Sequence, residues 1–188
     1  MMQEPYVHKI YTNDTERHNP FPLKKHGFLG ETAYSEQNAD LLDKAIFAYP
    51  IKHYANQDGE TGLSTDSIGK RGENFAVLEM DEFTVFIGDT FQMGEAIIQV
   101  SQPGPVSTKQ LQNGLHTGWY FRVLREGEIQ QEKDLVLLER PNPQWSVAAC
   151  IEIMFLQKDD LKAAEDLYSC QHLGGIWKRT LRKRLRGY

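Results

Sequence analysis

The chain has 188 residues, of which 40% are hydrophobic and 25% charged. This length suffices for one sizeable core with a small appendage, and the net charge of −5 is not that of a general nucleic-acid binder. The first nine residues lack the apolar stretch of a signal peptide, and the apolar run at 151–156 is too short to span a membrane. These observations predict a soluble, cytoplasmic protein.

The cysteine content excludes a disulfide framework. Only Cys150 and Cys170 occur, both in helix-like sequence and on the apolar side of their segments. The pair forms no CxxC metal motif, and buried free cysteine is the ordinary state of such residues.

The first part of the chain alternates short strands with long loops. Residues 6–12 place apolar side chains at alternate positions, which predicts an opening strand. Residues 45–49 form a second apolar run, which Pro50 should end. The polar, proline-rich or glycine-rich segments 13–25 and 56–72 are typical of loops.

The centre of the chain is the most β-like part. Residues 75–100 show a period near two with many β-branched and aromatic side chains, including the runs 83–87 and 96–100. The same rhythm continues at 119–124 and 134–138. Several short strands separated by turn residues predict a mainly β protein, either a barrel or a sandwich.

The pattern changes to helices after Pro141. Ser146 can cap a first helix, and Asp159 or Asp160 can cap a second. Apolar residues at helical spacing predict a third helix over 176–185. The sequence therefore predicts a β body and a short C-terminal extension of three helices.

The C-terminal segment 177–188 holds six basic and no acidic side chains. The chain has 21 basic and 26 acidic residues, so the remainder carries 15 against 26, a net charge of −11. The segment could contact a nucleic acid or another anion. It could equally be a solvated helix face that complements an acidic body. The sequence leaves both interpretations open.

Few side chains form a recognisable chemical motif. His26, His53 and His116 lack the spacing of a metal site, and Ser107 has no local base that would activate it as a nucleophile. The Glu73-Asn74 pair follows a glycine and can fix a turn or hold a polar ligand. No GxGxxG, GxxxxGK[ST] or GxSxG motif occurs.

Three segments carry a family resemblance: GENFAV at 72–77, IGDTFQMGEAIIQVSQP at 87–103 and GWYFRVL at 118–124. With the Trp-Lys-Arg-Thr segment at 177–180, they resemble the YiiM-like branch of the MOSC superfamily, the molybdenum-cofactor sulfurase C-terminal domain. The resemblance implies a MOSC-type β-barrel over 1–143 with a small three-helix extension over the rest of the chain. It also implies binding of the molybdenum cofactor (molybdopterin) and reduction of N-hydroxylated compounds, such as hydroxylaminopurines and amidoximes, or sulfur transfer.

The loop after residue 101 departs from the family pattern. The family sequence is Gln-Pro-Arg-x-Pro-Cys-x-Lys, and its cysteine ligates molybdenum. Gln102 and Lys109 match, whereas the arginine is replaced by Gly104 and the cysteine by Ser107. A thiolate suits the metal because it is soft and ionised at moderate pH. The family's His-Gly-Gly element, which precedes Asp-Arg-Ala, falls on Ala-Asp-Leu at 39–41 and loses its glycines.

The resemblance implies a set of pocket residues. Arg71 and Lys109 would bind anionic groups of a pterin, Glu73 and Asn74 its polar edges, and Ser107 would lie nearest the metal position. Gln102 would complete the pocket. The alternative hypothesis is a binding or regulatory module that keeps the fold without the redox centre. A homodimer is compatible with either hypothesis.

Overall fold

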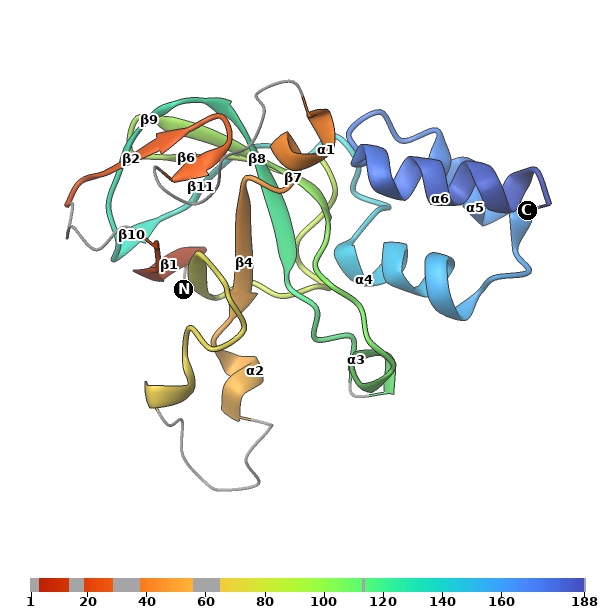
Figure 1. The fold of residues 1–188 in the computed structure, drawn as a ribbon, viewed down its shortest axis with the longest axis horizontal. Helices are drawn as coiled ribbons and strands as arrows, with labels where there is room; N and C mark the ends of the chain where they lie inside the picture. Colours follow the sequence, from red (N-terminus) through yellow and green to blue (C-terminus); the bar gives the residue numbers. More distant parts are fainter. Residues whose placement is uncertain (1–3, 14–18, 29–37, 56–64, 113, 188) are drawn as a thin grey trace.

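The computed structural model describes residues 4–13, 19–28, 38–55, 65–112 and 114–187. Its strands form an eight-stranded sheet and a separate three-stranded sheet (Figure 1). The strands are β1 (Tyr6–Ile10), β2 (Phe21–Lys24), β3 (Gly27–Phe28), β4 (Ile46–Pro50), β5 (Phe75–Leu78), β6 (Thr90–Met93), β7 (Ala96–Pro103), β8 (Trp119–Arg125), β9 (Gly127–Ile129), β10 (Lys133–Asp134) and β11 (Val136–Glu139).

The large sheet closes almost completely into a barrel. Its strand order is β10-β1-β5-β4-β8-β7-β6-β11, and only β4 and β5 run parallel. The first and last strands of this order are separated in the chain by Leu135 alone, so one continuous segment bridges the two sheet edges. The smaller sheet has the order β3-β2-β9. The mainly β, barrel-like fold expected from the sequence is confirmed.

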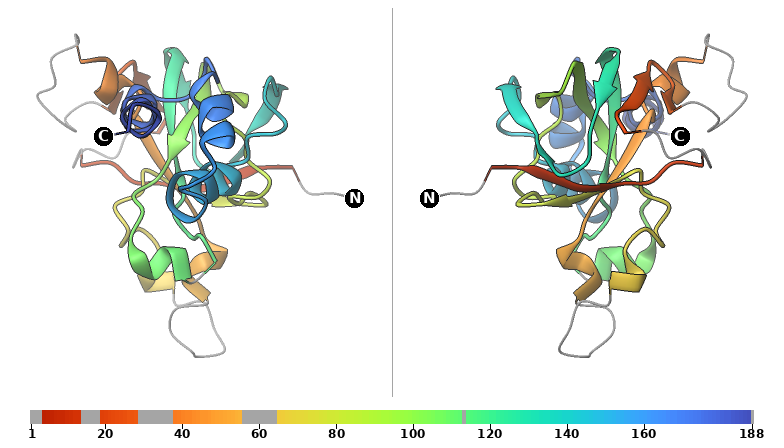
Figure 2. Two further views of the ribbon diagram at one scale, coloured as in Figure 1. Left: turned by 90° about the vertical axis from the view of Figure 1, so that its right-hand side faces the viewer. Right: turned by 90° about the vertical axis from the view of Figure 1, so that its left-hand side faces the viewer.

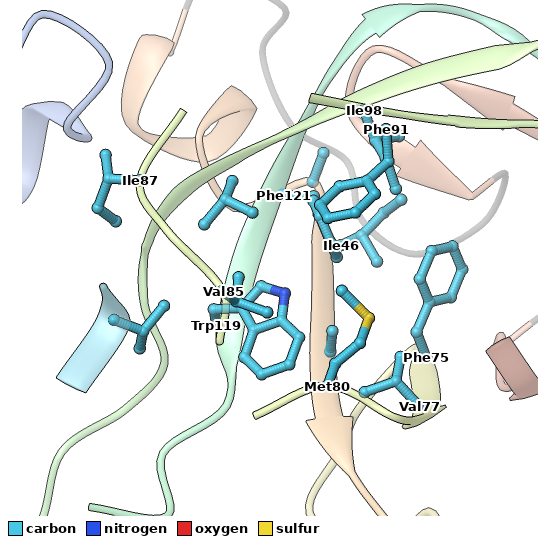
Figure 3. Packing of buried hydrophobic residues seen from close by; sticks show 14 of the residues in the cluster. Ile46, Phe75, Val77, Met80, Val85, Ile87, Phe91, Ile98, Trp119 and Phe121 are labelled. Atoms are coloured by element: carbon cyan, nitrogen blue, oxygen red, sulfur yellow. The ribbon is translucent and has the colours of Figure 1, made fainter. Parts of the chain in front are cut away.

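Strand alternation separates the barrel core from an outer aromatic cluster. Ile46, Trp119 and Phe121 lie in the core (Figure 3). Phe47 follows Ile46, and Tyr120 lies between Trp119 and Phe121. Both belong to a separate cluster outside the core, where their ring centroids are 5.1 Å apart. Because successive strand residues face opposite sides of a sheet, the residues that fill the core also fix this outer cluster.

The run 83–87 is not a strand, contrary to the sequence prediction. It forms turns, with one isolated bridge between Phe86 and Ser146. One carboxylate oxygen of Asp81 accepts hydrogen bonds from the backbone N–H groups of Phe83 and Thr84 at 2.8 and 3.0 Å. This side-chain bonding gives the backbone an alternative to a sheet ladder.

The C-terminal helices lie together at one side of the barrel (Figures 1 and 2). Ser146 caps the helix that begins at Val147 through the N–H of Ala149. Asp160, not Asp159, caps the predicted second helix, which begins at Leu161, through the N–H of Ala163. No helix in the described ranges is long and apolar enough to cross a membrane. The helices of this part are α4 (Val147–Ile151), η2 (Glu152–Leu156, a π-helix), α5 (Leu161–Tyr168) and α6 (Gly175–Leu185).

The described residues of the β part include four short helical turns, none of them expected from the sequence. Both α2 and α3 lie below the barrel in the views of Figures 1 and 2. The turns are α1 (Ala39–Leu42), α2 (Lys52–Ala55), η1 (Thr65–Ser67) and α3 (Thr108–Gln112).

The Asp43 side chain joins the barrel to α6. One carboxylate oxygen accepts a hydrogen bond from Nε of Arg122 on β8 at 2.8 Å, and the other accepts from the N–H of Gly175 at 2.9 Å. Arg122 also donates to the carbonyl of His172 at 2.9 Å. A second pair, Asp40 with Arg179, connects α1 to α6. The helices are thus tied to the barrel through polar contacts of α1 and β8.

We expect Asp43→Ala to lower the free energy of unfolding by about 3 kcal/mol, because it leaves the partly buried Arg122 without its carboxylate. Urea denaturation followed by circular dichroism measures this change. Asp166→Ala is the control, since it breaks a solvent-exposed pair with Lys162 and should leave the midpoint unchanged. Equal effects of the two substitutions would contradict a structural role for Asp43.

Candidate functional site

A cavity of about 610 Å³ lies against the outer aromatic cluster. Phe47 and Tyr120 line it from β4 and β8, and Pro105 lines it from the loop after β7. The residues that follow β1 (11–13) and the loop before β5 (69–74) contribute the other walls. The cavity therefore lies outside the barrel, between segments that are distant in sequence.

The cavity is bordered by positive charge. The Lys44 ammonium lies 5.5 Å from the centroid of the Tyr120 ring, and the Arg71 guanidinium lies 5.5 Å from that of Tyr49. His26 lines the cavity as well. Neither Lys44 nor Arg71 makes an ion pair with a carboxylate of the described residues. Among the described residues, therefore, no carboxylate competes as an ion-pair partner with an anionic ligand at these two cations.

The Glu73 carboxylate holds the loop that carries Arg71. Glu73 is 2% exposed, and one of its oxygens accepts from the Tyr54 hydroxyl at 2.5 Å and from the N–H of Gly69 at 2.9 Å. The other oxygen accepts from the N–H of Arg71 at 3.1 Å. Burial and this carboxylate raise the pKa of Tyr54 well above its usual value. Glu73 thus shapes the cavity wall and keeps both oxygens bonded within the protein.

Asn74 links two residues that line the cavity, Phe47 and Tyr11. Its side-chain oxygen accepts from the N–H of Phe47 at 2.8 Å, and its amide nitrogen donates to the carbonyl of Tyr11 at 3.4 Å. The geometry of Glu73 and Asn74 is that of turn-fixing residues, the structural alternative that the sequence left open.

Three of the expected pocket residues do not line the cavity: Gln102, Ser107 and Lys109. Gln102 is 3% exposed and reaches toward the helices, where a Cβ placed on Gly174 would lie 2.3 Å from its side-chain oxygen. Lys109 is exposed on α3 and does not line the cavity. The structure brings Arg71, Glu73 and Asn74 together at the cavity but not Gln102, Ser107 or Lys109.

Ser107 is exposed and caps α3. Its N–H donates to the side-chain oxygen of Gln110 at 2.7 Å, and its hydroxyl oxygen accepts from the N–H of Gln110 at 3.4 Å. This reciprocal pair is a capping box. The Gln110 amide also donates to the carbonyl of His116 at 3.2 Å. The serine at the family's cysteine position thus has a local structural role.

The residues around Gly104 leave no room for a side chain at this position. Its N–H donates to the carbonyl of Gly118 at 2.9 Å. A Cβ at this position would lie 2.1 Å from the carbonyl oxygen of Thr117. The arginine that the family has here could not be accommodated along this loop path.

The family's His-Gly-Gly element is replaced by the helical turn α1. Asn38 caps this turn by accepting from the N–H of Asp40 at 3.1 Å. Leu41 from the same turn lines the cavity. The segment that would approach a ligand through glycine backbone therefore presents a side chain instead.

A stack of two histidines lies beside the loop that carries Ser107. Nε2 of His53 is 2.7 Å from Oε2 of the fully buried Glu82, whose other oxygen accepts from the N–H of Gly118 at 2.7 Å. The His116 ring lies parallel to His53 at 3.7 Å between centroids. In the described part of the chain, no group of three or more His, Cys, Asp and Glu could hold a metal ion.

Sequence reasoning did not place Lys44, Phe47 or Tyr120 in the site. Lys44 falls in the Asp-Lys-Ala segment at the family's Asp-Arg-Ala position, so a basic residue there was a usable signal. The two aromatic residues were interpreted only as strand residues, because periodicity does not show which outward face becomes covered.

A profile of the MOSC domain matches residues 32–136, more than half of the chain. This chain belongs to the MOSC domain family. A profile of the YiiM-like, 3-alpha helix domain matches residues 145–187. Both matches confirm the resemblance seen in the sequence.

Individual relatives agree with this assignment. The uncharacterized protein YflK of Bacillus subtilis (strain 168) is 33% identical over 175 residues, which cover 86% of this chain and 78% of YflK. A protein named Reductase from Gibberella moniliformis is 30% identical over 64% of this chain, which corresponds to 24% of that longer protein. The crystal structure of YiiM from Escherichia coli superposes with a TM-score of 0.81 at 27% identity, covering 99% of this chain and 95% of YiiM.

We expect the folded protein to lose stability as the pH falls below about 6.5, the ordinary pKa of histidine. Burial, His53 and the nearby cations lower the pKa of His116 in the folded state. The unfolded chain therefore takes up a proton first, and stability declines until the pH reaches the lower folded pKa. Urea titrations between pH 7.5 and 5 measure this decline.

His116→Phe keeps an aromatic ring on the stack and removes the titrating group, so its stability should depend less on pH over this range. His8→Phe, at an exposed position of β1, is the matched control. A variant at position 116 with the same slope as the wild type would show that the stack does not contribute.

Proposed function

We propose that this protein binds a phosphorylated pterin of the molybdenum-cofactor type in the cavity against Phe47 and Tyr120. The observation that carries the proposal is the pair of cations at the cavity, Lys44 and Arg71, beside an aromatic floor. A flat heterocycle gains contact area on such a floor, and phosphate is well matched by a guanidinium and an ammonium. Membership of the MOSC family supports this ligand class.

Each cavity residue has a distinct role in this proposal. Arg71 and Lys44 bind the anionic group, and His26 is available for a further polar contact. Glu73 and Asn74 act indirectly, because their hydrogen bonds fix the backbone of Arg71 and Phe47. The pterin end of the cofactor therefore fits the residues that are present.

The metal end of the cofactor does not fit them. The MOSC family holds molybdenum through a cysteine thiolate, and this chain has Ser107 at that position, bonded into the first turn of α3. Cys150 and Cys170 are buried in the helical part, where loss of solvent raises the pKa of both thiols.

A second candidate function is a reductase activity, favoured by the relative named Reductase, and the resemblance to the MOSC family suggests N-hydroxylated compounds as its substrates. Its test is turnover of an N-hydroxylated purine by protein loaded with the molybdenum cofactor and supplied with an electron donor. Turnover that is abolished by Arg71→Gln would support this activity at the cavity. Absence of turnover in a protein that still binds the pterin would favour the non-catalytic module.

We expect Lys44→Gln and Arg71→Gln each to weaken binding of a phosphorylated pterin about 10-fold to 100-fold, because each removes a charge-assisted hydrogen bond. Quenching of pterin fluorescence on titration with protein measures the dissociation constant. Lys109→Gln is the control, because Lys109 lies on α3 outside the cavity. Equal losses for Lys109→Gln and Lys44→Gln would place the ligand at α3 instead.

A further inference from the structure

The protein has no thiolate to offer at the cavity. Cys150 is fully buried on α4, and Cys170 is 5% exposed in the turn after α5. Neither residue lines the cavity. Because the chain contains only these two cysteines, no movement of a single loop would bring a soft, ionised sulfur to a bound pterin.

The residue at the family's cysteine position is engaged elsewhere. The Ser107 hydroxyl oxygen accepts from the N–H of Gln110, and the Gln110 side chain accepts from the N–H of Ser107. A serine with glutamine three residues later is the pairing that a capping box requires. Both partners are therefore suited to starting α3, and the hydroxyl oxygen is directed at the helix backbone.

Two other departures from the family, at Gly104 and in the segment that replaces His-Gly-Gly, also fit their surroundings. The backbone of Gly104 lies so close to Thr117 that a Cβ would be 2.1 Å from its carbonyl oxygen. Asp40, in the segment that replaces His-Gly-Gly, is paired with Arg179 of α6. Ser107 and Asp40 thus have contacts of their own, and Gly104 fits where a larger residue would clash.

We propose that the cavity is a pterin site in which no side chain of this protein bonds to a metal. A phosphorylated pterin without molybdenum is then as good a ligand as the molybdenum-loaded cofactor. Affinity comes from the aromatic floor and the cations Lys44 and Arg71, which contact parts common to both forms. This inference deepens the proposed function and rests on it.

The test compares the affinities of the two forms. Metal-free molybdopterin and the molybdenum-loaded cofactor are released anaerobically from a donor protein and titrated separately against this protein. Equal dissociation constants, within about threefold, support the inference. A preference of tenfold or more for the loaded form, lost in Ser107→Ala, overturns it. Binding of neither form overturns the proposed function itself, and binding of both with a strong Ser107-dependent preference overturns only this inference.

Two variants separate metal ligation from helix capping. Ser107→Asp keeps a good capping residue for α3, whereas Ser107→Ala removes the cap and should lower the unfolding midpoint. Neither should alter the affinity for the metal-free pterin by more than about threefold. In X-ray absorption spectra of the bound loaded cofactor, the metal environment should be the same in the wild type and Ser107→Ala. A change in that environment would show a bond from Ser107 and would contradict the inference.

Discussion

The Asp43 residue joins the barrel to the C-terminal helices by hydrogen bonds, beside the hydrophobic core that the two parts share. It accepts from Arg122 on β8 and from the first N–H of α6, while its backbone carbonyl accepts from the Ser101 hydroxyl on β7. A partly buried ion pair adds little net stability but is costly to break, so such a pair constrains geometry. Lys44 is the next residue in the chain, and the position of Asp43 therefore also sets one charged end of the cavity.

The cavity follows from strand alternation combined with a loop that buried hydrogen bonds keep in place. Phe47 faces outward because its strand neighbours fill the barrel core. The outward face becomes a cavity only because Glu73 and Asn74 hold the adjacent loop over it. These two residues keep their polar atoms bonded within the protein, so the ligand-facing charge comes from Arg71 and Lys44.

The departures from the MOSC family pattern are consistent with one another. A glycine at 104 lets the loop pack against Thr117 and Gly118, just before β8, and Ser107 then begins a helical turn with Gln110. The Gln110 side chain reaches the carbonyl of His116, which stacks on His53. The loop that would carry a metal ligand is thereby joined to a structural network beside the cavity.

Sequence motifs were enough to identify the family, and periodicity and residues close in the chain were enough to predict the β body, the cap at Ser146 and a cap at Asp159 or Asp160. The sequence also pointed to Arg71 and to the Glu73-Asn74 turn. For Lys44, the Asp-Lys-Ala segment contained a usable signal. The positions of Gln102 against the helices and of the outer aromatic residues at the cavity depend on contacts between distant segments, such as Asp43 with Arg122, and local patterns contain no information about these contacts.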